Sequence, residues 1–250
     1  SIQEAKSHIY SAIKNSDFSF PQRKVTVNLA PADIKKQGPS YDLPIAVSIL
    51  SATNRINLKD SPDKMLFAGE LALNGDLRPI NGALSISLLA KEKGIKTIFL
   101  PAANAAEAKL AQNIEVIPVK NLAELTAHLE GRKIIEPAGE EKIDFSGNEA
   151  PFDMTHVSGQ EHVKRALEIA AAGAHNILMS GPPGSGKTFV ARAFASILPD
   201  LTLEEALELT KIYSIAGELP ADTAVIKHRP FRSPHHTASP VSIIGGGANP

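Results

Sequence analysis

The stretch HNILMSGPPGSGKTFVARAFASIL, residues 175–198, decides how the second half of the chain folds. An apolar run, a glycine-rich octapeptide and a segment of helical periodicity follow one another, which predicts a strand, a loop and a helix. Glycine lets backbone N–H groups turn inward around phosphate oxygens, and the N-terminus of the helix adds partial positive charge. The order and spacing together predict a phosphate-binding P-loop.

The octapeptide GPPGSGKT also predicts how a nucleotide would be held. Lys187 would reach the β- and γ-phosphates, and the hydroxyl of Thr188 would complete the ligand shell of Mg²⁺. We therefore expect ATP and Mg²⁺ as cofactors, Lys187 and Thr188 as catalytic residues, and Thr188 as the metal ligand. The predicted cofactor-binding set is the whole loop: Gly181, Pro182, Pro183, Gly184, Ser185, Gly186, Lys187 and Thr188.

Hydrolysis of a nucleotide needs more than this loop, namely an acid on a later strand and usually an arginine against the γ-phosphate. No strand-borne acid follows Thr188, because the segment LTLEEALELTKIY, residues 201–213, has a helical pattern. We expect its carboxylates on a solvated helix face: Glu204, Glu205 and Glu208. Alone, this chain is expected to bind ATP without efficient hydrolysis.

Length and composition set wider limits. With 250 residues, 43% of them hydrophobic, the chain can form one large domain or two ordinary ones. Lys and Arg number 26 against 27 Asp and Glu, so any nucleic-acid site must be a local patch. The absence of cysteine excludes disulfides and thiolate zinc sites. No apolar run approaches the ~20 residues that cross a bilayer and no signal-peptide pattern is present, so we expect a cytoplasmic location without membrane contact.

Residues 1–131 show mixed α and β patterns. The stretch 24–31 reads as extended and apolar, 42–52 as a buried helix with Pro44 near its start, and 66–80 as a hairpin about Asn74-Gly75. Helix and strand patterns then alternate, each closed by Gly, Pro or Asn. The predicted helices are 83–94, 102–112 and 121–131, and the predicted strands are 96–101 and 114–119.

Residues 132–154 lose this periodicity and gain proline, glycine and charge, which indicates an exposed linker. A second domain, residues 155–250, then begins with a helix in the stretch 157–173 and continues into the predicted strand 175–180 before the P-loop.

The last segment, KHRPFRSPHHTASPVSIIGGGANP, residues 227–250, is basic and contains no Asp or Glu. Its prolines favour an extended loop or hairpin. Such a loop can pack on its own domain or contact a phosphate backbone, and charge alone leaves both readings open. Neighbouring histidines on an extended chain should point to opposite faces, which argues against a shared metal. The candidate DNA contacts are Lys227, Arg229, Arg232, His235 and His236.

Four stretches resemble the ComM (YifB-like) proteins, which group with the magnesium chelatases among AAA+ ATPases. They are NLAPADIKKQGPSYDLPIA, GELALNGDLRPINGAL, GQEHVKRALEIAAAGAHNILMSGPPGSGKT and FRSPHHTASPVSIIGGGANP, and the likeness extends over essentially all 250 residues. The resemblance implies a Lon-protease-like α+β domain of ribosomal S5 type in residues 1–131. It implies the N-terminal part of a P-loop AAA+ α/β domain of magnesium-chelatase type in residues 155–250.

The resemblance further implies a hexameric ring that couples ATP hydrolysis to DNA branch migration, a helicase-like activity on branched or single-stranded DNA, in natural transformation. In that family the Walker B acid, sensors and arginine finger follow the glycine-rich stretch, and the first domain begins earlier, so we expect a fragment truncated at both ends. Three alternatives stay open: an ATP-dependent Lon-like protease; a magnesium-chelatase-like ATPase, against which the stretch FRSPHHT argues; and a non-enzymatic nucleotide-binding assembly module, which would bind ATP without turnover.

Ser40, in the tripeptide GPS, stands where the Lon-type proteases carry their nucleophile. A serine hydroxyl needs a base within hydrogen-bond reach. The resemblance places Leu84 at the position of the catalytic lysine, and Lys91 lies about 10 Å further along the predicted helix. Nothing in the spacing directs Lys35 or Lys36 at the serine. We therefore expect Ser40 to be a vestigial protease position with a structural role.

Overall fold

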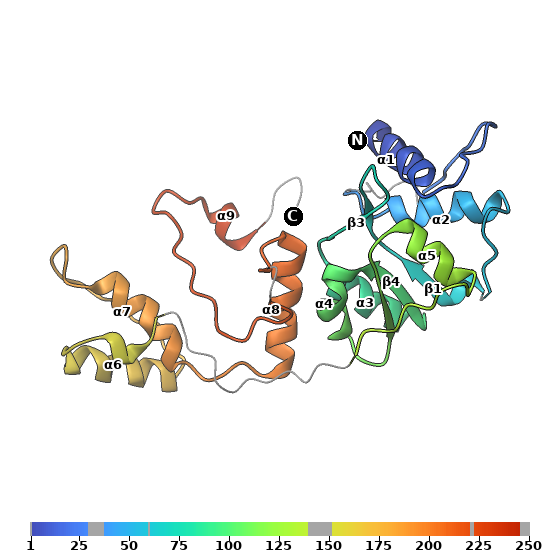
Figure 1. The fold of residues 1–250 in the computed structure, drawn as a ribbon. Coiled ribbons are helices and arrows are strands. Elements are labelled where there is room, and N and C mark those ends of the chain that lie inside the picture. Colours follow the sequence, from blue (N-terminus) through green and yellow to red (C-terminus); the bar gives the residue numbers. More distant parts are fainter. Residues whose placement is uncertain (1, 30–37, 60, 140–151, 221–222, 246–250) are drawn as a thin grey trace. The chain divides into compact units, whose positions relative to one another are not determined.

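The structure, a computed structural model, describes residues 2–29, 38–59, 61–139, 152–220 and 223–245 (Figure 1). The chain divides into two compact units. Unit 1 contains residues 1–144 and 207–226, and unit 2 contains residues 145–206 and 227–250. No helix within the described ranges is long and apolar enough to cross a bilayer.

A three-stranded parallel sheet forms the centre of unit 1, with strand order β1-β4-β5. The strands are β1 (Met65–Phe67), β4 (Thr97–Pro101) and β5 (Glu115–Val119). In the register, Phe99 of β4 lies beside Phe67 of β1 and Ile117 of β5. The central strand is buried from Ile98 onward, which explains why its sequence is a continuous apolar run rather than an alternating one. The two strands predicted at 96–101 and 114–119 are thereby confirmed.

Two further predictions in unit 1 are confirmed, the hairpin over a shorter range than 66–80, because residues 66–67 belong to β1 and pair with β4 instead. Helix α2 (Asp42–Ala52) carries Pro44 in its first turn, where a missing N–H costs no helical hydrogen bond. Strands β2 (Glu70–Leu71) and β3 (Leu77–Arg78) pair antiparallel around the Asn74-Gly75 turn, and Gly75 adopts a φ of +90° that favours glycine. The Arg78 guanidinium lies 3.2 Å from the Glu70 carboxylate across this hairpin.

The helices that follow the hairpin agree with the sequence pattern, with one difference. Helices α3 (Ala83–Glu92) and α5 (Leu122–Leu129) form as predicted, and the Asn121 side chain accepts a hydrogen bond from Glu124 N–H at the start of α5. The helix predicted at 102–112 is shorter: a 3₁₀ turn, η2 (Ala102–Asn104), leads into α4 (Ala105–Lys109). Positive φ at Gln112 and Asn113 is incompatible with a continuing right-handed helix. A second 3₁₀ turn, η1 (Pro62–Lys64), precedes β1.

The N-terminal helix α1 (Ile2–Asn15) closes the core of unit 1. Its buried side chains Ile9, Ala12 and Ile13 follow the i, i+3, i+4 spacing of one helix face and belong to the same hydrophobic cluster as α2. After α1, the predicted extended segment 24–31 forms no strand over its described part, residues 24–29. A strand needs a neighbour for its backbone groups, and no described segment pairs with this one.

Residues 207–226, which include most of α8 (Leu203–Ala216), belong to unit 1. The Ser214 hydroxyl accepts a hydrogen bond from Gly82 N–H at 2.8 Å and donates one to the Glu107 carboxylate. Glu107, which is buried, also accepts from Leu84 N–H at 2.8 Å. A carboxylate at the N-terminus of α3 is favoured by the helix dipole, so this network fixes α3, α4 and α8 together.

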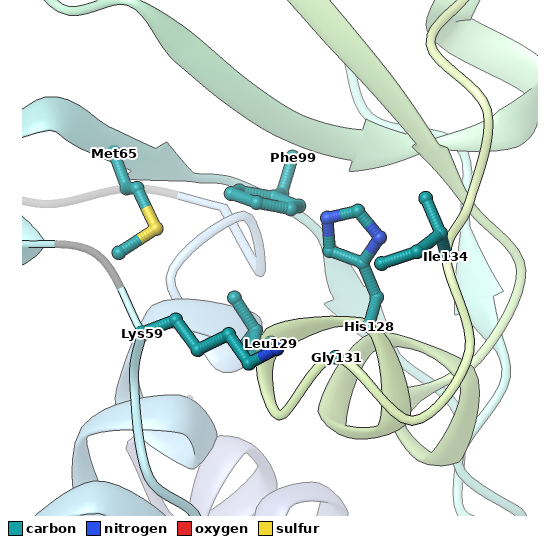
Figure 2. A pocket seen from close by; sticks show the side chains of 7 residues that line it. All are labelled: Lys59, Met65, Phe99, His128, Leu129, Gly131 and Ile134. Carbon is teal, nitrogen blue, oxygen red and sulfur yellow. The ribbon is translucent and has the colours of Figure 1, made fainter.

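Unit 1 also contains a small cavity of about 140 Å³ (Figure 2). The end of the Lys59 side chain lies against Gly131, just beyond the C-terminus of α5, where positive charge is favourable. Phe99 presents its ring to the cavity and to the ring of His128, at a centroid distance of 5.6 Å. The lining residues are Lys59, Met65, Phe99, His128, Leu129, Gly131 and Ile134.

Unit 2 is smaller and helical over its described residues. Its helices are α6 (Glu161–Ala172), within the predicted 157–173, α7 (Lys187–Phe194) and the short α9 (Pro240–Ile244), with 3₁₀ turns η3 (Met154–His156) and η4 (Ala195–Ile197). Its small core is built from Val157, Leu167, Val190 and Ala193. The strand predicted at 175–180 is wrong for the described chain: no strand pairs with it, and Leu178 is 94% exposed.

Candidate nucleotide-binding site

The octapeptide 181–188 forms a loop that opens directly into α7 (Lys187–Phe194). Gly184 and Gly186 adopt φ of +79° and +82°, a left-handed conformation that costs other residues about 1–2 kcal/mol. The loop therefore requires glycine at these two positions for its backbone shape. Gly181 has no such constraint, since a Cβ there would meet Ser185 Oγ at an ordinary 3.4 Å.

Lys187 folds back over the loop that precedes it. Its Nζ donates hydrogen bonds to the carbonyl oxygens of Gly181 at 2.9 Å and Pro182 at 2.7 Å, and lies 3.3 Å from Ser185 Oγ. The ammonium group is thus positioned inside the curve of the loop. Phosphate oxygens are stronger partners for an ammonium than neutral carbonyls, so a phosphate chain could replace these contacts.

The start of α7 offers donors that suit a phosphate. Gly186 is the N-cap and supplies no side-chain cap, so the first N–H groups of the helix lack a side-chain partner there. Thr188 lies exposed in this first turn, where its hydroxyl can bind Mg²⁺ beside the phosphates. Lys187, the N-terminal helix dipole and the threonine together fit a magnesium-bound triphosphate.

Two neighbours of the loop are not predicted from its sequence motif. The Gln160 amide Nε2 lies 3.5 Å from the Ser185 carbonyl oxygen and contacts the loop from the start of α6. On α7, the Phe189 ring meets Phe152 edge to face at 6.1 Å, and the Arg192 guanidinium lies 5.2 Å from the centre of the Phe152 ring. These contacts join the chain before η3 to the helix that follows the loop. Gln160 lies in the stretch that begins at Gly159 and resembles the family, but its contact with the loop, like that of Phe152 with α7, is seen only in the folded chain.

The predicted helix over residues 201–213 is confirmed as α8, and it begins with a Thr-x-x-Glu capping box. Thr202 N–H donates to the Glu205 carboxylate at 2.9 Å, and Glu205 N–H donates to the Thr202 hydroxyl at 3.2 Å. Glu204 and Glu208 are exposed, as expected for a solvated face. Glu205 is half-buried instead, and the hydrogen bond from Thr202 N–H, followed by Arg229, lowers its pKa.

Arg229, one of the candidate DNA contacts, is engaged within unit 2. Its Nε donates to the carbonyl oxygen of Pro199 at 2.7 Å, and its guanidinium lies 3.2 Å from the Glu205 carboxylate. The negative charge of Glu205 compensates this arginine locally. Arg229 therefore fixes the basic segment to the start of α8, whatever else it contacts.

The other basic candidates lie in the irregular chain before α9. Lys227 is half-buried, whereas Arg232 is exposed. The expectation that His235 and His236 point to opposite faces is wrong: their ring centroids are 4.2 Å apart, and the His235 Nδ1 lies 2.7 Å from Thr237 Oγ1 because the chain turns there. Within the described ranges, no group of three or more His, Cys, Asp or Glu side chains could hold a metal ion.

Ser40 lies half-buried in the turn before α2. Its carbonyl oxygen accepts a hydrogen bond from Gly69 N–H at 3.0 Å, which connects this turn to the hairpin. No hydrogen bond joins its hydroxyl to a basic side chain in the part of the chain that the structure describes. Lys35 and Lys36 lie outside the described residues.

The position of the protease lysine is equally unsuited to proton transfer. Leu84 is fully buried in the first turn of α3. The Nζ of Lys91 donates to the carbonyl oxygen of Ala111 at 3.0 Å, so this lysine is engaged by the turn before β5. The described residues thus contain no assembled serine–lysine dyad around Ser40.

A glycine loop that opens a helix and encloses a lysine is the arrangement of P-loop nucleotide-binding proteins. Comparison with known families agrees with this class of protein and identifies a family within it. The family "Magnesium chelatase, subunit ChlI" matches residues 153–250, and the family "Subunit ChlI of Mg-chelatase" matches residues 1–104. The chain belongs to the ComM/YifB-like magnesium chelatase family of AAA+ proteins.

Individual relatives support the same assignment. A YifB protein of Salmonella typhimurium is 44% identical over 252 residues, which cover 100% of this chain and 48% of the relative. The competence protein ComM of Haemophilus influenzae is 39% identical over 254 residues, which cover 100% of this chain and 49% of the relative. A Lon protease of Metamycoplasma arthritidis is 30% identical over 118 residues, or 45% of this chain and 14% of the protease. The chain spans about half the length of the YifB and ComM relatives.

Proposed function

We propose that the intact protein is an ATP-driven AAA+ motor that acts on DNA and couples ATP hydrolysis to branch migration, with helicase-like activity in natural transformation. The observation that carries the ATP part is the Lys187 ammonium inside the curve of the glycine loop. The DNA part is supported by the similarity to ComM, which is named a competence protein in Haemophilus influenzae, and by the basic segment 227–250.

In this proposal the loop residues 181–188 hold ATP and Mg²⁺. Lys187 binds the terminal phosphates, the N–H groups at the start of α7 bind the remaining oxygens, and the Thr188 hydroxyl binds the metal. Hydrolysis of ATP supplies the free energy for movement on DNA. The proposal also assigns residues 1–131 to a Lon-like domain, residues 155–250 to the first part of an AAA+ domain, and residues 132–154 to the linker.

Nucleotide binding is tested by replacing Lys187 with alanine and titrating a fluorescent ATP analogue in the presence of Mg²⁺. Loss of a charged hydrogen bond of about 1.5–3 kcal/mol corresponds to an affinity roughly 10- to 100-fold weaker. Arg165→Ala removes one positive charge from the exposed face of α6 and is the matched control. Equal affinities of the two variants would refute the assignment of the loop.

The DNA part is tested on the intact protein by measuring ATP turnover with and without four-way branched DNA at low salt. A large stimulation by branched DNA is expected, because a motor hydrolyses ATP productively on its track. Turnover that is indifferent to every DNA structure would reject the motor. We also propose a cytoplasmic hexameric ring, which sedimentation velocity with ATP and Mg²⁺ would detect as a six-fold mass.

The match to a Lon protease and the position of Ser40 favour an ATP-dependent protease as the second candidate. An unfolded protein substrate would then be cleaved, and Ser40→Ala would abolish cleavage. The burial of Leu84 and the engagement of Lys91 by Ala111 argue against this outcome. The family match also keeps a chelatase-like ATPase as an alternative, which an assay of Mg²⁺ insertion into a porphyrin would reveal.

A further inference from the structure

We propose that unit 1 carries a second DNA contact, a surface on α1 and the turn after it that binds single-stranded DNA through base stacking and phosphate contacts. The inference rests on the proposed DNA function and extends it to a part of the chain remote in sequence from the basic segment 227–250. We name this surface the α1 face. It consists of Lys6, Tyr10, Lys14, Phe20, Arg23 and Lys24.

The helix geometry aligns the first three of these residues. Ile9, Ala12 and Ile13 are buried and fix the orientation of α1 on the core. Lys6, Tyr10 and Lys14 follow at intervals of four residues, which places them in one exposed stripe beside the buried face. The two lysines are about 12 Å apart along the helix axis, so they can contact different phosphates of one strand.

An exposed aromatic ring lies in the middle of this stripe. Tyr10 is 43% exposed, although a tyrosine ring gains more by burial. Phe20 supports it from the following turn at a centroid distance of 5.1 Å, and the Lys14 Nζ lies 5.2 Å from its ring centre. The ring is therefore held at the surface with the Lys14 ammonium over one face. A stacking base would displace this exposed lysine side chain, whose ammonium could then bind the neighbouring phosphate.

Positive charge exceeds negative charge in the chain around the ring. Residues 2–29 contain Lys6, Lys14, Arg23 and Lys24 against two acids, Glu4 and Asp17. All four cations are exposed, and none of them forms an ion pair with a side chain that the structure describes. Arg23 lies three residues after Phe20, at most about 11 Å away along the chain, so the positive surface continues past the aromatic pair.

A single strand fits this surface better than a duplex. Phosphates of either form would be attracted by the cations, but only an unpaired strand presents base faces that can stack on Tyr10. Stacking accepts any base, so the α1 face should bind without sequence preference. A motor that separates or exchanges strands generates such unpaired DNA, which connects the surface to the proposed function.

The test measures fluorescence anisotropy of labelled oligothymidylate, and of a duplex of the same length, with the full chain at low salt. Tyr10→Leu keeps an apolar side chain beside Phe20 but removes the stacking ring, and should weaken single-strand binding about tenfold with a smaller effect on the duplex. Tyr41→Leu changes a comparably exposed tyrosine, 39% exposed, outside the α1 face and should leave binding unchanged.

A charge variant supplies an independent readout that does not depend on repacking around Phe20. Replacing Lys6 and Lys14 with glutamine should reduce the slope of log affinity against log salt by about 1.4 for single-stranded DNA. Equal affinity of Tyr10→Leu and Tyr41→Leu together with an unchanged salt slope would overturn the proposal. Binding of the wild type to anionic lipid vesicles but not to oligothymidylate would overturn it as well.

Failure of this inference is distinguishable from failure of the proposed function. If single-strand binding is lost on replacement of Lys227 and Arg232 but is insensitive to every change in the α1 face, the DNA function stands and the α1 face does not take part. If the wild-type chain binds neither oligothymidylate nor duplex, while intact protein shows no stimulation of ATP turnover by branched DNA, both proposals are rejected.

Discussion

At the scale of single residues, the buried carboxyl of Asp42 makes the stability of the fold depend on pH. The residue is 1% exposed, and burial raises the pKa of the carboxyl, although Leu71 N–H at 3.4 Å and His8 at 3.8 Å favour the charged form. Glu70 adds repulsion that raises it further. The folded state therefore holds a proton on this group more tightly than the unfolded chain does.

This shift fixes the sign of a pH effect. A raised folded pKa contributes stability that is complete below the unfolded pKa, about 3.8, and is lost as pH rises through the folded value. Asp42→Asn removes the charge and can still accept the Leu71 N–H. We expect the free energy of unfolding of this variant, relative to that of the wild type, to increase as the pH rises from acidic to neutral. Chemical denaturation across this range measures it, and a difference that is independent of pH would contradict the shift.

Two glycines allow a matched prediction about backbone strain. Gly94 and Gly131 follow α3 and α5 with φ of +71° and +69°. A Cβ at Gly94 would meet open space, whereas one at Gly131 would overlap the Lys59 Nζ in the cavity of Figure 2. The end of a lysine side chain moves at low cost. Alanine at either position should therefore destabilise the chain by about 1–2 kcal/mol in thermal denaturation. A much larger loss at Gly131 would show that Lys59 is fixed there.

At the scale of elements, the sequence predicts those helices, strands and turns that are determined by local residue patterns. Helix α2, the hairpin β2–β3 and strands β4 and β5 follow from periodicity and turn residues, and the loop 181–188 follows from motif spacing. The segments 24–29 and 175–180 carry strand patterns but form no strand, because pairing depends on a neighbouring segment rather than on their own residues. For the same reason no pattern predicts that Arg229 pairs with Glu205, 24 residues away.

The attachment of α8 to unit 1 gives a prediction at this scale. Ser214→Ala leaves Gly82 N–H without its acceptor and removes a donor from the buried Glu107 carboxylate. Unsatisfied buried groups cost about 1–3 kcal/mol, so thermal unfolding should occur at lower temperature. Ser48→Ala is the control, since Ser48 is exposed and its Oγ donates to the carbonyl oxygen of Pro44 in its own helix. Comparable losses for the two variants would show that the network does not anchor α8.

At the scale of the whole molecule, the net charge of −1 gives no information about DNA, so a DNA contact must come from how local charges are distributed. In the segment 227–250, the cation Arg229 is already compensated by Glu205. Its replacement would disturb the start of α8 as well as any contact with DNA. Lys227 and Arg232 are the other two Lys or Arg residues of this segment and are tested separately from Arg229, which serves as the structural comparison.

Replacing Lys227 and Arg232 together with glutamine should weaken duplex binding uniformly across sequences and reduce the slope of log affinity against log salt by up to about 1.8, since each phosphate contact releases counterions. Arg229→Gln should change this slope less and lower the thermal stability more, because it breaks the hydrogen bond to Pro199 and the pair with Glu205. Anisotropy titrations at several salt concentrations, paired with thermal unfolding, separate the two effects. If the double variant keeps the wild-type slope while Arg229→Gln reduces it, the DNA contact lies at Arg229, and Glu205 must release it on binding.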